Sequence, residues 1–283
     1  MRSGLVGGGA GFCEDRGVKH QGTVTRGTTN PNRLRRVDRW IVAVHGGLLR
    51  SAGSPLVADL GYGASPVTTV ELFRRLRAVR RDIRVTGVEI DPERVLAAQP
   101  FAQPGLDFIR GGFELPLPCP AILIRAFNVL RQYTEAEAWT AWDTLTAAVA
   151  PGGLVVEGTC DELGRRAVWV ALDAAGPATI TFSARLAGLA QPSELAERLP
   201  KTLIHRNVPG EPVYALLRDL DRAWASAAPL RAFGARQRWI AACGSLAGSW
   251  PVYPTPPAGG PGRWRLGELT LPWSAVAPGP GVP

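Results

Sequence analysis

Hydrophobic and polar positions alternate along the first two thirds of the chain in two periods. Short apolar runs that suit buried strands alternate with longer stretches whose apolar residues recur every three to four positions, as in amphipathic helices. This pattern predicts an α/β fold with a doubly wound parallel sheet. The expected strands cover residues 57–60, 84–90, 106–110, 121–124 and 154–158, and the expected helices cover 67–79 and 135–149.

The first apolar run ends in an acid, Asp59, and turns through Gly61 and Gly63. Glycine adopts positive φ and has no Cβ, so the chain can turn sharply and let a ligand approach the backbone. Ser65 suits an N-cap and Pro66 the first position of the next helix. The segment therefore predicts a strand, a turn that borders a nucleotide pocket, and a helix behind it.

A second acid, Glu89, ends the next expected strand, and Asp91-Pro92-Glu93 opens another helix. In doubly wound folds an acid at this strand end hydrogen-bonds a ribose, so both a dinucleotide and an adenosyl cofactor are compatible with the spacing. A dinucleotide site, however, requires a third glycine for close helix packing, and Pro66 stands in that part of the turn. The pattern therefore disfavours an NAD-type oxidoreductase.

With Asp59 before the Gly-x-Gly turn and Glu89 after the second strand, the segment 55–157 resembles the class I S-adenosylmethionine-dependent methyltransferases. The resemblance implies that Asp59, Gly61 and Gly63 face the methionine end of the cofactor and that Glu89 holds the ribose hydroxyls. Ordinary strand-end capping is the alternative interpretation of both acids. Pro151-Gly152-Gly153 before the strand at 154–158 also recurs in this fold.

The chain departs from the family pattern at two acids. Gly112 stands where the family has an acid that contacts adenine, so adenine recognition passes to the backbone and ring of Phe113, or to Glu114 by a shifted register. Ala121 stands where the fourth strand commonly begins with an aspartate. A non-catalytic relative that has lost cofactor binding is therefore one of the alternatives.

The segment after the fourth expected strand resembles the family's loop beside the transferable methyl group. This makes Arg125, Asn128 and Tyr133 candidates for the acceptor side, and Asn128 and Tyr133 weak candidates for catalysis. The alternative is a loop held together by hydrogen bonds from its own polar side chains.

Beyond Gly158 the chain changes character. Alternation over 165–172 and 178–184 predicts an antiparallel hairpin, with a helix over 165–175 as the alternative. Helices are expected near 193–199, 212–227 and 230–246, followed by a last strand over 263–271. We divide the chain into a flexible N-terminus with a basic helical arm (1–50), a cofactor-binding domain (51–190), a mainly helical cap (191–274) and a disordered tail (275–283).

The cap is where we expect acceptor choice, because methyl transfer needs mainly alignment of the acceptor and exclusion of water. His205, in the turn that also holds Asn207, is a candidate general base, and Asn207 a candidate acceptor-binding residue. A helix-end histidine is the alternative. Arg26 in the N-terminal arm is a candidate for binding the cofactor carboxylate.

Composition limits the class of protein without selecting a function. The chain has 283 residues, of which 46% are hydrophobic and 20% charged, enough for a globular core. No apolar run reaches the length of a membrane span, and we expect no membrane association. Four separated cysteines and three histidines show no metal or disulfide spacing, so we expect no metal and a cytoplasmic location.

The net charge is +8, and the first fifty residues contribute nine Arg or Lys against three acids. Asn32 suits the N-cap of a helix running to about Leu49 that carries Arg33, Arg35, Arg36 and Arg39. Such a helix can track phosphates, although a solvated basic face is the commoner meaning. The sequence thus favours an S-adenosylmethionine-dependent methyltransferase with a small-molecule acceptor. The alternatives are an RNA methyltransferase that uses the Arg-rich arm and a non-catalytic relative.

Overall fold

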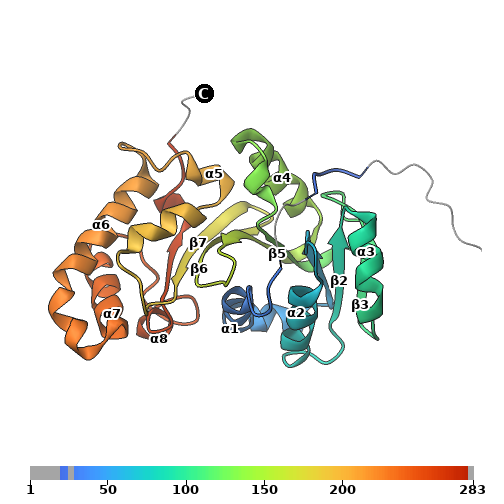
Figure 1. Ribbon diagram of the computed structural model, residues 1–283, viewed down its shortest axis with the longest axis horizontal. Helices are drawn as coiled ribbons and strands as arrows, with labels where there is room; N and C mark the ends of the chain where they lie inside the picture. Colours follow the sequence, from blue (N-terminus) through green and yellow to red (C-terminus); the bar gives the residue numbers. More distant parts are fainter. Residues whose placement is uncertain (1–19, 25–28, 280–283) are drawn as a thin grey trace, which may run out of the picture.

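A single mixed sheet of eight strands organises the chain in the computed structural model, which describes residues 20–24 and 29–279 (Figure 1). The strand order is β3-β2-β1-β4-β5-β6-β7-β8. The first five strands in this order are parallel, and β6, β7 and β8 join them as antiparallel neighbours. The bounds of the strands are β1 Leu56–Leu60, β2 Arg84–Glu89, β3 Leu106–Arg110, β4 Ala121–Phe127, β5 Val149–Cys160, β6 Arg166–Asp173, β7 Gly176–Ala184 and β8 Glu268–Pro272.

Helices cover both faces of this sheet, which confirms the doubly wound α/β fold expected from the sequence. The α-helices are α1 Arg35–Ser51, α2 Val67–Arg77, α3 Pro92–Ala98, α4 Glu135–Ala147, α5 Lys201–Ile204, α6 Pro212–Ser226, α7 Ala235–Leu246 and α8 Pro261–Trp264. Short 3₁₀ turns are η1 Gln99–Phe101, η2 Leu130–Gln132, η3 Pro192–Arg198, η4 Ala228–Phe233 and η5 Trp273–Ala275. Among the helices described, none is both long and apolar enough to cross a membrane.

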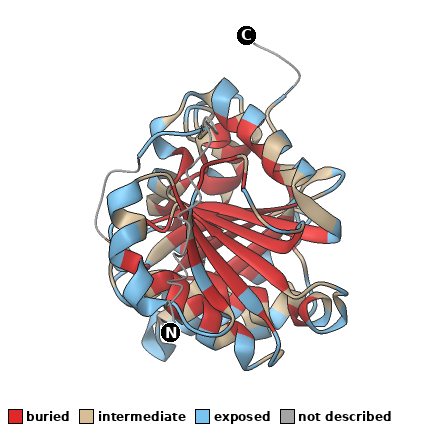
Figure 2. Ribbon diagram, turned by 90° about the vertical axis from the view of Figure 1, so that its right-hand side faces the viewer, coloured by how far each residue is buried: buried red, intermediate tan, exposed pale blue. Residues whose placement is uncertain are grey.

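The sheet separates two hydrophobic cores, and its central strands are buried on both sides, whereas the edge strand β3 exposes Asp107 and Arg110 (Figure 2). One core packs α1, α2 and α3 against the parallel strands, with Trp40, Phe73 and Trp169 fully or almost fully buried. The other core joins α4 to the C-terminal helices through Trp142 and Trp239. Burial on both faces explains why the strands appear in the sequence as continuous apolar runs.

Several element boundaries differ from the sequence prediction. Helix α1 begins at Arg35 rather than after Asn32, whose side chain accepts a hydrogen bond from Arg75 instead of capping the helix. Helix α2 begins at Val67, with Pro66 at the N-cap position. The hairpin expected over 165–184 is present as β6 and β7, and the last strand is shorter than expected because residues 261–264 form α8.

Candidate active site

The turn after β1 has the backbone conformation that its glycines predict. Gly61 and Gly63 have φ values of 67° and 81°. The Gly61 N–H donates to the carbonyl of Val88 at 2.7 Å, and the Gly63 N–H donates to the Glu89 carboxylate at 2.8 Å. The turn is thus attached to the end of β2, and both strands finish at the same edge of the sheet.

Asp59 belongs to a buried network of charges under this turn. The Arg125 guanidinium donates to both Asp59 oxygens, at 2.8 and 2.7 Å, and to Asp38 Oδ1 at 2.5 Å. Thr69 Oγ1 also donates to Asp59, at 2.6 Å, and Arg75 donates to the second oxygen of Asp38. Burial alone would lower the pKa of Arg125, but the two carboxylates raise it above its ordinary value. The guanidinium therefore stays charged and fixes the orientation of Asp59.

The sheet register explains this network. Asp59 and Arg125 are direct partners on the parallel strands β1 and β4, and their side chains point to the face covered by α1 and α2. Helix α1 places Asp38 on that face, and α2 places Thr69 there. An arginine in the middle of a buried strand requires carboxylate partners, and the fold supplies two.

Arg125 consequently does not occupy the acceptor-side loop where the sequence placed it. Strand β4 continues to Phe127, three residues further than predicted, and Arg125 is 0% exposed within it. The strand continues because residues 123–126 pair with both neighbouring strands and Phe127 pairs with Gly158 of β5. Arg125 therefore acts on the site through Asp59.

Glu89, at the end of β2, is buried and hydrogen-bonded to backbone amides. One carboxylate oxygen accepts from Gly63, and the other accepts from Ile90 at 3.0 Å and Asp91 at 3.3 Å. Arg94 of α3 lies 3.8 Å from the carboxylate. Glu89 therefore caps the end of its strand and also forms part of the wall of a small neighbouring cavity.

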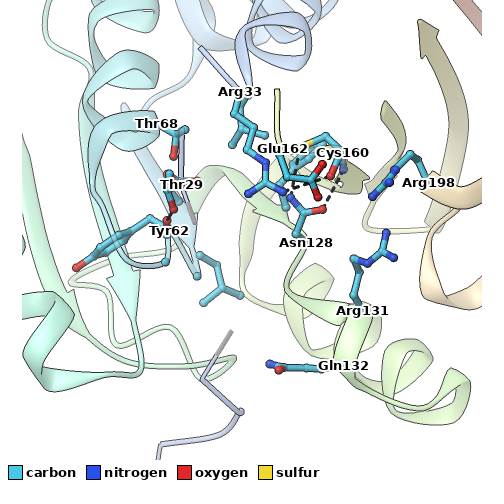
Figure 3. Close-up of a pocket in the computed structure, with 16 residues that line it drawn as sticks. Thr29, Arg33, Tyr62, Thr68, Asn128, Arg131, Gln132, Cys160, Glu162 and Arg198 are labelled. Atoms are coloured by element: carbon cyan, nitrogen blue, oxygen red, sulfur yellow. Dashed lines mark hydrogen bonds between the residues drawn. The ribbon is translucent and has the colours of Figure 1, made fainter. Parts of the chain in front are cut away.

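A cavity of about 360 Å³ opens at the carboxyl edge of the sheet, where ligands bind in doubly wound folds (Figure 3). Asp59, Gly61 and Gly63 form its wall on the β1 side, and Asn128 forms part of the opposite wall. The fold therefore brings four of the candidates from the sequence to one cavity. Its lining carries the carboxylates of Asp59 and Glu162 and the guanidinium groups of Arg33, Arg131 and Arg198.

On the far side of this cavity, Asn128 and Cys160 are hydrogen-bonded to each other. Asn128 has a φ of 60°, and its amide accepts from the Cys160 N–H at 3.0 Å and contacts the thiol at 3.3 Å. Burial raises the pKa of the Cys160 thiol. The cavity therefore ends against a neutral thiol, and Arg131 and Arg198 extend towards it from η2 and η3.

Residues 20–24, which we call the strap, cross the same edge of the sheet. The Phe113 N–H donates to the Gln21 carbonyl at 2.9 Å, and a Cβ on Gly112 would lie 1.9 Å from that carbonyl oxygen. The Thr23 N–H donates to the Tyr133 hydroxyl at 2.5 Å. The Glu114 carboxylate contacts the strap as well, accepting from the Gln21 N–H and lying 2.8 Å from His20 Nδ1.

The strap changes the role of the predicted adenine contacts. Gly112, Phe113 and Tyr133 do line one cavity with Glu89, but that cavity measures only about 20 Å³ because the strap fills the rest. The Phe113 N–H, proposed from the sequence as an adenine donor, is used by the strap. The alternative through Glu114 is likewise engaged with the strap.

The candidates from the predicted cap lie elsewhere. His205 is exposed at the C-terminal end of α5, where its Nε2 lies 3.1 Å from the Lys201 ammonium, and neither His205 nor Asn207 lines the cavity. The helix-end interpretation of His205 therefore fits its position. Arg26 lies outside the described residues. Among the described residues no group of three or more His, Cys, Asp or Glu side chains is arranged to hold a metal ion.

Sequence reasoning missed the arginines of the cavity and the partners of Arg125. Arg33, Arg131 and Arg198 come from segments more than sixty residues apart in sequence, so no local motif joins them. One signal for the buried network was available, namely an arginine in an otherwise apolar strand, which indicates a buried acid nearby.

No protein-family model and no curated protein matches the chain. Among solved structures, the Synechocystis magnesium protoporphyrin IX methyltransferase with bound SAH matches at 21% identity and a TM-score of 0.35, over 46% of this chain and 55% of that one. Human N-acetylserotonin methyltransferase in complex with SAM matches at 24% identity and a TM-score of 0.31, over 47% of this chain and 39% of that one. The plantazolicin methyltransferase in complex with a triazolic desmethylPZN analogue and SAH matches at 13% identity and a TM-score of 0.35, over 46% of each chain. Each of these three methyltransferases matches somewhat less than half of this chain, and the match covers between 39% and 55% of their own lengths.

Proposed function

We propose that the protein is an S-adenosylmethionine-dependent methyltransferase. The observation that carries the proposal is the juxtaposition of Asp59, the positive-φ glycine turn and Glu89 at the carboxyl edge of the parallel strands, beside a cavity of about 360 Å³. The bound cofactor would supply the activated methyl group, so the protein has to bind, orient and exclude water.

The residues at this edge fit the cofactor at its methionine end. The Asp59 carboxylate borders the cavity and suits the positive sulfonium and ammonium groups of the cofactor. Its orientation is fixed in advance by Arg125, so binding requires no reorganisation there. Glu89 would hold the ribose hydroxyls. At the adenine end, Gly112 and Phe113 would be available to the cofactor once the strap moves aside.

For the acceptor we propose a small molecule that carries an anionic group. Arg131 and Arg198 both line the cavity, and their proximity contributes to lowering the pKa of Arg131, after the larger effect of burial. Nε of Arg198 is shielded from solvent and has no hydrogen-bond partner among the described residues. A carboxylate or phosphate on the acceptor would offset the repulsion between the two guanidinium groups and would offer Arg198 a hydrogen-bond acceptor. Glu162, the exposed carboxylate at the cavity wall, is placed to accept a proton from the acceptor.

Titration calorimetry with S-adenosylmethionine and S-adenosylhomocysteine tests the proposal. Asp59→Ala is the direct variant, but it also removes a partner of Arg125, so we choose Asp59→Asn with Asp38→Asn as the matched control. Each variant removes one of the two carboxylate charges that pair with the Arg125 guanidinium. Of the two aspartates, only Asp59 lines the cavity. We expect both ligands to bind the wild type, and Asp59→Asn to weaken binding about tenfold more than Asp38→Asn. Absence of binding heat with the wild type would refute the proposal and favour the non-catalytic alternative.

RNA is a second candidate for the acceptor. The observation that favours it is a second, arginine-lined groove on the other side of the start of α1. Transfer of a radioactive methyl group from the cofactor to total RNA, compared with transfer to a small-molecule extract, separates the two acceptor classes.

A further inference from the structure

A groove of about 850 Å³ lies beside the candidate active site and is distinct from it. It is bordered by the first turns of α1, the β5–β6 turn, the segment after β7, the start of α7 and the α8–β8 turn. Figure 1 shows α1, α7 and α8 along the same side of the molecule. Segments from five parts of the chain therefore meet around this groove only in the folded protein.

Arginine dominates the lining of the groove. Six exposed arginines border it, and none has an ion pair among the described residues. A seventh lining arginine, Arg36, is half-buried and donates to the carbonyl of Leu266 at 2.9 Å. The groove has one carboxylate, Glu268, which is buried and paired with Arg263. The six exposed arginines are Arg35, Arg39, Arg165, Arg185, Arg236 and Arg265.

Six exposed guanidinium groups without an ion pair among the described residues make this groove strongly positive. Burial lowers the pKa of Arg36, Glu268 and Asp161 oppose this shift, and Arg185 and Arg35 add smaller lowering effects. Guanidinium groups bind phosphate oxygens through two parallel hydrogen bonds, which suits a row of phosphodiesters. Charge complementarity therefore selects an occupant with repeated phosphates.

Exposed apolar side chains border the same groove. Phe233 is 74% exposed, and Leu163 and Leu266 are 57% and 48% exposed. A positively charged groove with an exposed aromatic ring is the arrangement that binds single-stranded nucleic acids, since unpaired bases stack on the ring while the backbone follows the charges. An anionic lipid surface would also bind to these arginines, but it has no bases to stack on the Phe233 ring.

We propose that this arginine groove binds single-stranded RNA, with its phosphates on the six exposed arginines and a base on Phe233. The groove adjoins the active-site cavity, because Arg33 and Leu34 line the cavity while the next residues, Arg35 and Arg36, line the groove. A strand held in the groove would therefore lie next to the cavity. RNA binding in the groove does not depend on the proposed methyl transfer.

The test is fluorescence anisotropy with a labelled oligouridylate and no cofactor, so its failure is separate from failure of the cofactor proposal. A neutralised phosphate contact on a single strand contributes about 0.7 to the slope of log affinity against log salt, or about fivefold in affinity near 0.1 M salt. Arg39→Gln combined with Arg236→Gln should therefore weaken binding about 25-fold and lower the slope by about 1.4.

The matched control is Arg74→Gln combined with Arg81→Gln. These arginines, in and after α2, are also exposed and without an ion pair among the described residues, so net charge changes equally while the groove is intact. The control should keep wild-type affinity. Equal effects of the two double variants would overturn the proposal, because they would show attraction to overall charge only.

Phe233→Ala tests the aromatic contact, with Phe233→Tyr as the conservative variant. We expect Phe233→Ala to weaken oligouridylate binding at least about fivefold and Phe233→Tyr to restore it, since base stacking on aromatic rings has this strength. Unchanged melting temperatures will show that the exposed substitutions leave the fold intact. Wild-type binding to phosphatidylserine vesicles but not to oligouridylate would overturn the proposal in favour of a membrane surface.

Discussion

Glu157 gives the sharpest test of the energetics of the fold. It lies in β5, is 1% exposed, and its carboxylate accepts a hydrogen bond from Trp142 Nε1 at 3.3 Å. No ion pair to it is found among the described residues, so burial raises its pKa to about 8, against a small opposing effect of the Trp142 hydrogen bond. The group is therefore protonated in the folded protein at neutral pH, whereas the unfolded chain holds it ionised.

The consequence is a pH-dependent free energy of unfolding. A group whose folded pKa is raised stabilises the fold fully below its unfolded pKa and loses that contribution as pH rises through the folded pKa. Between the ordinary value of 4.5 and about 8, the loss is about 1.4 kcal/mol per pH unit, or on the order of 5 kcal/mol in total. Glutamine at this position cannot ionise and should abolish this part of the pH dependence.

The measurement is urea unfolding of the wild type and Glu157→Gln at several pH values between 4.5 and 8. The difference in unfolding free energy should move in favour of Glu157→Gln by about 1.4 kcal/mol for each pH unit. Asp107→Asn, which changes an exposed carboxylate on β3, is the control and should show little such trend. A difference for Glu157→Gln that does not change with pH would refute a raised pKa for this residue.

Other predictions follow from the buried network and from the strap. Arg125→Met leaves Asp38 and Asp59 without their shared cation and should destabilise the protein by about 3–5 kcal/mol in urea unfolding, whereas Arg74→Met, on the exposed face of α2, should change it by less than about 0.5 kcal/mol. A loss below about 1 kcal/mol for Arg125→Met would show that the network contributes little. A chain that begins at Val24 lacks most of the strap, so S-adenosylmethionine should bind it more tightly in calorimetry, on the order of tenfold, since hydrogen bonds to the strap no longer compete. Weaker binding would mean that the strap completes the cofactor site.

Local interactions explain why much of the fold was predictable. The positive φ of Gly61 and Gly63, and the cap that Asp91 makes on α3 through the Glu93 N–H, each depend on a few consecutive residues. The parallel strands were recognisable because burial on both faces requires continuous apolar runs. The order of Asp59, the glycine turn and Glu89 along the chain then identified the carboxyl edge of the sheet as the candidate site.

Boundaries and partners could not be read from local patterns. Residue 125 was placed in a loop because an arginine ordinarily ends an apolar strand, and only the pairing of β4 with β1 shows that two carboxylates compensate its charge. His205 and Asn207 were grouped with the site because polar turns often carry function, but neither residue lines the cavity in the folded chain.

Amphipathic periods and the glycine turn, which arise from neighbouring residues, were sufficient to define the α/β class and the edge of the sheet where doubly wound folds bind ligands. The strand register and the packing of helices on the sheet decided that Arg125 fixes Asp59 and that the strap covers Phe113. The same packing gathered arginines from five segments around one groove. Contacts between residues far apart in the chain leave no periodic signal, because each depends on the simultaneous position of several elements.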